Sequence, residues 1–92
     1  MILNSEEATR RARADLAQRL GVPEMDIVTI SVADTVFPDA ALGAYLEDEM
    51  AADVLTNGWT ITLSGRDGAP VEYRGSDKQL RLFNFNGENY QL

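Results

Sequence analysis

The chain has 92 residues, 45% of them hydrophobic, and its 8 Lys and Arg against 15 Asp and Glu give a formal net charge of -7. This composition is typical of one acidic globular domain and leaves no room for a two-domain enzyme. Because the chain has neither cysteine nor histidine, it lacks the residues of disulfide scaffolds, thiol nucleophiles, iron–sulfur clusters and the usual structural zinc sites.

A helix is predicted over residues 5–20 near the start of the chain. Asn4 or Ser5 can cap its first turn, and Gly21 supplies its end. Small and apolar residues recur at every fourth position and form a stripe suited to packing on a sheet. The stripe consists of Ala8, Ala12, Leu16 and Leu20.

Four strands follow, each indicated by alternating apolar and polar residues or by β-branched residues. They lie at about 26–37, 59–64, 71–74 and 80–85. Turn-forming residues separate the last three strands, and Asn86-Gly87 can start a short return of the chain. The predicted fold class is α+β: one N-terminal helix packed on an antiparallel sheet of about four strands, with a long acidic crossover loop after the first strand.

Large apolar residues are expected on both faces of this sheet. Within 80–85, alternation turns the two leucines to one face and the two phenylalanines, Phe83 and Phe85, to the other. The simplest cover for the second face is the long segment 38–56 folded across it. In the alternative, Phe83, Phe85 and Tyr90 form a secondary surface for a partner, or for a homodimer through the open sheet face.

The segment 38–56 fits neither a helical nor a strand period, although residues 44–53 could form a short helix. A connection of this length is uncommon in a compact domain unless it is functional or mobile. It falls within a run from Leu20 to Gly65 that holds eight acidic residues and no Lys or Arg. The run therefore predicts a negative pole, which would attract a protein with a basic patch.

The candidate binding residues lie in the loop 40–53 and immediately before it. They are Asp39, Leu42, Gly43, Tyr45, Glu47, Asp48, Glu49 and Asp53. The four acids from Glu47 onward lack the alternating spacing and central glycine of a calcium loop, so no metal site is expected. No cofactor and no catalytic residue is assigned.

The acidic balance also argues against other classes of partner. Nucleic acid and anionic membranes both require a basic protein surface, so neither is expected as a partner. The first residues are too acidic for a secretory signal, and no run approaches the roughly 20 apolar residues of a membrane span. A cytoplasmic location is therefore expected.

Together these patterns predict a non-enzymatic protein-binding or regulatory module that uses the acidic loop 40–53 and the adjacent sheet edge. One alternative is a peptidase inhibitor that presents the same loop to a protease. Another is a small hydrolase that uses the carboxylates of Asp34, Asp39 or Glu47. The hydrolase ranks last, because the sequence has neither histidine nor cysteine to assist it.

Three short stretches carry a resemblance to known domains. They are Leu20-Gly21-Val22-Pro23, Phe37-Pro38-Asp39 followed by Leu42-Gly43, and Asn57-Gly58-Trp59. Over about residues 8–74 the chain resembles a family of small uncharacterised bacterial domains with an aromatic-Pro-Asp-x-x-Leu-Gly motif. Members of that family are often exported and carry cysteines near the Leu-Gly motif and before the turn that precedes the next strand. At those places this chain has Ala41, Ala44, Ala51 and Ala52, which fits a reducing compartment better. In outline the chain is also similar to PepSY modules, which implies binding or inhibition of peptidases.

Overall fold

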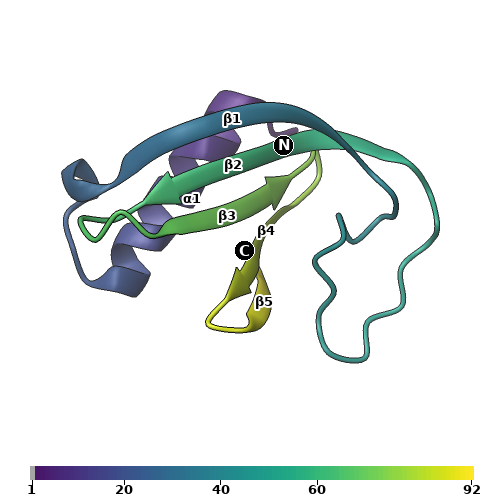
Figure 1. Cartoon of the computed structure of the whole chain (residues 1–92). Helices are drawn as coiled ribbons and strands as arrows, with labels where there is room; N and C mark the ends of the chain where they lie inside the picture. Colours follow the sequence, from purple (N-terminus) through teal and green to yellow (C-terminus); the bar gives the residue numbers. More distant parts are fainter. Residues whose placement is uncertain (1) are drawn as a thin grey trace.

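The computed structural model describes residues 2–92. It is a five-stranded antiparallel meander with a helix on one face (Figure 1). The elements are α1 (Ser5–Leu20), the short 3-10 helix η1 (Glu24–Asp26), β1 (Val28–Phe37), β2 (Thr56–Ser64), β3 (Pro70–Gly75), β4 (Leu80–Phe85) and β5 (Glu88–Gln91). The strand order is β1-β2-β3-β4-β5, so the chain runs across the sheet from one edge to the other.

The helix begins and ends where the sequence predicts. The Asn4 side chain accepts a hydrogen bond from the Glu7 amide at 2.8 Å, and Gly21 closes the helix in the left-handed conformation at φ 69°. An N-cap side chain satisfies a free amide of the first turn, and glycine adopts positive φ without strain. The fold class α+β is confirmed.

The number of strands differs from the expected four, because the chain ends in a fifth strand. Asn86 and Gly87 both have positive φ, 53° and 85°, and they join β4 to β5. Two residues at positive φ match the natural twist of a tight hairpin, and Asn-Gly is the preferred pair for it. The short return suggested by Asn86-Gly87 is thus a paired strand.

The core lies between α1 and one face of the sheet. Leu16 is fully buried on the helix, where it packs with Ile61, Leu63 and Leu82 from the strands. The Tyr73 hydroxyl, also in this layer, donates to the Asp15 carboxylate of α1 at 2.7 Å. Burial of the phenol raises its pKa. Of the predicted helix stripe, Leu20 is the exception, because it remains 42% exposed at the helix end.

The phenylalanines of β4 lie on opposite faces, so the expectation of a shared face is wrong. Asn84 adopts φ 51°, and the pairing of β4 with β5 changes register between Leu82 and Phe85. This irregularity returns Phe85 to the helix side, where it packs on the core near Tyr90. Phe83 stays on the far face, with the Arg74 guanidinium 3.6 Å from its ring centre.

A close approach between β2 and β3 makes Gly58 sensitive to substitution. A Cβ at this position would collide with the Gly75 carbonyl oxygen and lie 3.1 Å from the Phe37 ring. We expect Gly58→Ala to lower the free energy of unfolding by about 1–3 kcal/mol, because backbone must shift to admit the methyl group. Urea denaturation measures this, with Asn57→Ala at the exposed neighbouring position as the control. A loss no larger than that of the control would contradict the packing of the two strands.

Candidate functional site

The connection between β1 and β2 contains no helix, so the short helix considered for 44–53 is wrong. Turns occupy residues 40–43 and 47–48. Leu42, Gly43 and Asp48 have φ of 59°, 68° and 61°, which a right-handed helix cannot accommodate. Residues 38–49, called here the anchored segment, and residues 50–55, the exposed segment, have different surroundings.

Asp39 organises the first turn of the anchored segment. The residue is 5% exposed, and its carboxylate accepts hydrogen bonds from the amides of Ala41 at 3.0 Å and Gly43 at 2.9 Å. The Tyr45 hydroxyl donates to the second oxygen at 2.6 Å, and this bond lowers the pKa of Asp39. The Pro-Asp step therefore closes a corner of the fold, and it holds Leu42 in a fully buried position.

Three side chains at the β3–β4 end of the sheet hold the backbone of the anchored segment. Arg74 donates to the Leu42 carbonyl at 3.0 Å, Gln79 to the Ala40 carbonyl at 2.6 Å, and Arg81 to the Ala44 carbonyl at 3.0 Å. These contacts join residues 32 to 39 positions apart in the sequence. They hold the anchored segment at the β3–β4 end of the sheet, on the face where the paired residues Arg74 and Arg81 project.

Glu49 completes the attachment through a two-pronged ion pair. Its carboxylate oxygens lie 2.5 Å and 2.7 Å from the two terminal nitrogens of Arg81, which is 4% exposed. The same carboxylate accepts the Leu46 amide at 3.0 Å. The Arg81 hydrogen bonds, followed by the Leu46 amide, lower the pKa of Glu49 to about 2. Glu49 is therefore a structural latch and not a free surface charge.

The eight sequence-predicted site residues divide into two sets. Asp39, Leu42, Gly43 and Glu49 are buried or partly buried and fix the loop to the sheet. Tyr45, Glu47, Asp48 and Asp53 keep exposed side chains. In the exposed segment, Met50 is 96% and Leu55 75% exposed, two apolar residues that the sequence did not single out.

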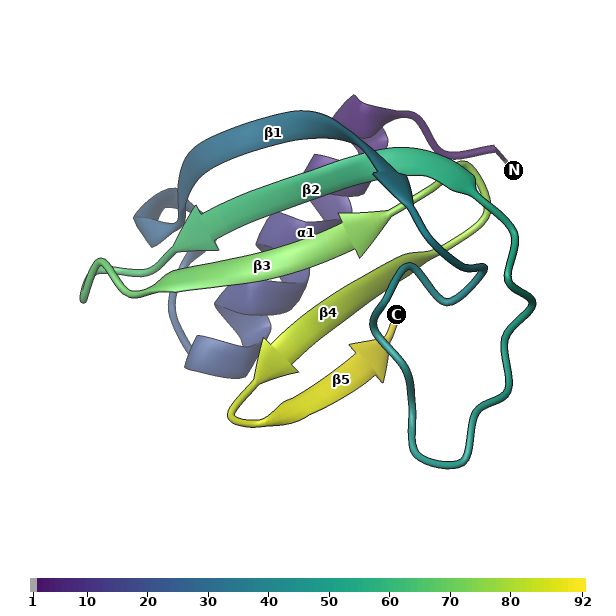
Figure 2. The same ribbon diagram turned by 45° about the vertical axis from the view of Figure 1, so that its right-hand side comes forward.

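The sequence predicted that a sheet edge beside the loop takes part in binding, but it did not assign that edge to a strand; in the structure β1 forms a free edge. Within residues 2–92, β1 pairs only with β2 and forms one edge of the sheet (Figure 2). Eight of its ten residues are exposed. Four of the exposed residues are large aliphatic ones: Val28, Ile30, Val32 and Val36. Asp34 is its one charged residue, and the strand has no lysine or proline of the kind that commonly guards sheet edges. The alternation in this region indicated a half-buried strand, but not which strand would be outermost.

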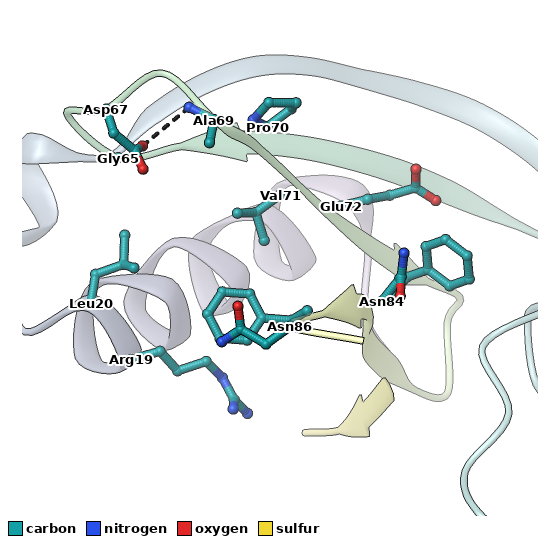
Figure 3. Close-up of a pocket in the computed structure, with 12 residues that line it drawn as sticks. Arg19, Leu20, Gly65, Asp67, Ala69, Pro70, Val71, Glu72, Asn84 and Asn86 are labelled. Atoms are coloured by element: carbon teal, nitrogen blue, oxygen red, sulfur yellow. Dashed lines mark hydrogen bonds between the residues drawn. The ribbon is translucent and has the colours of Figure 1, made fainter. Parts of the chain in front are cut away.

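A hollow of about 560 Å³ lies between the end of α1, the start of β3 and the end of β4. Figure 3 shows Arg19 and Leu20 from the helix, Val71 and Glu72 from β3, and Asn84 near the end of β4 around it. All three of its charged residues already have internal partners. Arg19 pairs with Asp15 at 2.7 Å, Glu72 pairs with Arg74 at 2.6 Å, and the Asp67 carboxylate accepts the Ala69 amide at 3.1 Å.

The carboxylates considered for hydrolysis do not converge. Asp39 is engaged in its turn by the hydrogen bonds described above, of which that from the Tyr45 hydroxyl contributes most to lowering its pKa. Asp34 and Glu47 line separate hollows, the first beside Trp59 and the second beside Tyr45. In residues 2–92, no group of three or more acidic side chains is placed to hold a metal ion.

The chain is a small α+β domain. Its β1–β2 connection is held to the sheet by side-chain hydrogen bonds, and β1 is an open edge of that sheet. The family model described as Domain of unknown function (DUF8738) matches residues 9–83, so the chain belongs to that family. No curated protein and no solved structure matches the chain. In the part of the chain that the structure describes, no helix is long and apolar enough to cross a membrane.

Proposed function

We propose that this protein is a non-enzymatic binding module that pairs an extended segment of another protein with the free edge of β1. The observation that carries the proposal is the exposure of eight of the ten residues of β1 together with its open outer side. An unpaired strand edge presents amides and carbonyls that a second strand can satisfy, and exposed side chains beside it supply specificity. β5, the opposite edge, has only four residues.

The acidic loop supports this function by attracting the partner. Glu47, Asp48 and Asp53 are exposed, and the run from Leu20 to Gly65 has no base to offset them. Charges of this kind mainly accelerate association with a basic partner. Because the anchored segment is held by Arg74, Gln79 and Arg81, the charges of Glu47 and Asp48 stand in fixed positions. Glu47 lies beside the β4–β5 turn, so these charges act on a partner of β1 at long range.

Selection from a displayed library of twelve-residue peptides tests the proposal. We expect the enriched peptides to bind the double variant Ile30→Lys and Val32→Lys about tenfold or more weakly, because lysines on an edge strand oppose the addition of another strand. Both positions are exposed, at 53% and 42%, so the variant should fold. Its melting temperature verifies this.

The matched control carries the same change of charge away from β1. Gln18→Lys on α1 and Gln91→Lys on β5 both replace exposed residues, and this double variant should bind the peptides nearly as the original chain does. Peptides that bind both double variants equally would overturn the proposal, since the outer side of β1 would then have no part in binding.

A further inference from the structure

A second hollow, of about 720 Å³, lies beside the carboxyl end of β1. Its lining includes two carboxylates, Asp34 and Asp77, and the apolar side chains of Val36, Leu55 and Trp59, but no basic residue. Within residues 2–92 neither carboxylate has a side-chain hydrogen bond or an ion pair. Both negative charges are thus available to a group from outside the chain.

The hollow is lined by residues at the end of β1, by residues 55–59 at the start of β2, and by Asp77 from the turn after β3. Asp34 pairs directly with Trp59 of β2, so the two side chains lie on the same face of the sheet. A partner residue opposite Asp34 on the free edge would extend this row, with its Cβ about 4.5–5.5 Å from that of Asp34. Lysine and arginine are long enough to reach the carboxylate from that position.

The apolar lining matches the rest of such a side chain. Val36 is 61% and Leu55 75% exposed, although both are aliphatic. The methylene stem of lysine or arginine can cover apolar surface of this kind while its charged end meets the carboxylates. Trp59, which is half-buried against the core, also lines the hollow, and aromatic rings attract cations.

We infer that this hollow, hereafter the Asp34 pocket, receives a lysine or arginine side chain from the strand that pairs with β1. The inference rests on the proposed function and names the chemistry of the partner. A second copy of the chain does not supply that group through its own β1, because no Lys or Arg occurs between Leu20 and Gly65. β5, the opposite edge strand, has no Lys or Arg either, so the partner is an extended basic segment of a different protein.

Three synthetic peptides test the inference. Each has ten residues that alternate valine and threonine, and they differ only at one central position, which holds lysine, norleucine or glutamate. In NMR titrations of the ¹⁵N-labelled chain, the lysine peptide should bind about tenfold tighter than the norleucine peptide, because its ammonium group meets unpaired carboxylates. The glutamate peptide should bind weakest. The amide of Asp34 and the indole N–H of Trp59 should shift with the lysine peptide.

Two matched variants isolate the pocket from the overall charge. Asp34→Asn with Asp77→Asn should remove the preference for lysine over norleucine. Glu6→Gln with Glu24→Gln removes the same charge at exposed positions outside the Asp34 pocket, and this variant should keep most of the preference.

The possible failures are distinguishable. Equal binding of the three peptides, with shifts along β1, would overturn the inference and leave edge pairing intact. Absence of any shift along β1 with every peptide would contradict the proposed function as well. Concentration-dependent shifts of the β1 amides without peptide would show that a second copy occupies the edge. This result would also overturn the inference that a basic side chain of a different protein enters the Asp34 pocket.

Discussion

Replacement of Leu16 by alanine should lower the free energy of unfolding by about 2–5 kcal/mol. Leu16 has no exposed surface and lies in the middle of α1, against Ile61, Leu63 and Leu82 of the sheet. Truncation removes its transfer energy and leaves a cavity, because α1 is the one α-helix over this face in the described chain. Urea denaturation measures the loss directly.

Leu20→Ala provides the matched control on the same helix. Leu20 is 42% exposed, so its truncation should cost about 1 kcal/mol or less. If Leu16→Ala costs no more than Leu20→Ala, the face of α1 that packs on the sheet is assigned wrongly.

Replacement of Glu49 by alanine should cost about 3 kcal/mol, because it leaves the Arg81 guanidinium buried without its counter-charge. Arg81 is 4% exposed, whereas the Glu49 side chain keeps 23% of its surface. We expect faster amide exchange in the anchored segment together with the loss of stability. Glu47→Ala, at an exposed position of the same loop, should change stability by about 0.5 kcal/mol at most. Equal losses in the two variants would contradict the latch.

The same ion pair sets a pH dependence whose sign follows from the pKa of Glu49. That pKa is about 2 in the folded chain against an ordinary value of 4.5. The ion pair therefore contributes its full stability above pH 4.5 and loses it as the pH falls toward 2. The difference in unfolding free energy between the original chain and Glu49→Gln should shrink over this interval. A difference that stays constant across it would contradict the role of the charge.

Local signals in the sequence were sufficient for α1 and the first four strands, but not for β5, for the structure of residues 44–53 or for the arrangement of the strands. Asn4 and Gly21 marked the ends of the helix because capping depends on neighbouring residues. The side of the sheet that Phe85 occupies depends on the positive φ of Asn84, and strict alternation cannot anticipate such an irregularity. The position of β1 at the edge likewise follows from the order of pairing and not from its own residues.

The candidate site was predicted only in part, for a similar reason. The acidic loop was recognisable from composition, and Glu47, Asp48 and Asp53 are exposed as a solvated acidic surface requires. Glu49 looked the same in the sequence, but its partner Arg81 lies 32 residues away. Long-range pairs of this kind appear only when the sheet has been assembled. They separate the residues that hold the loop from those that remain available to a partner.

Amide hydrogen exchange along β1 tests the central claim most directly. In the free chain, about half of the β1 amides should exchange rapidly, because alternate residues of an edge strand direct their amides away from the neighbouring strand. With a saturating library-selected peptide, these outward amides should slow by about tenfold or more, while those bonded to β2 change little. Unchanged exchange along β1, with protection confined to the loop or to β5, would contradict the pairing of a partner strand with this edge.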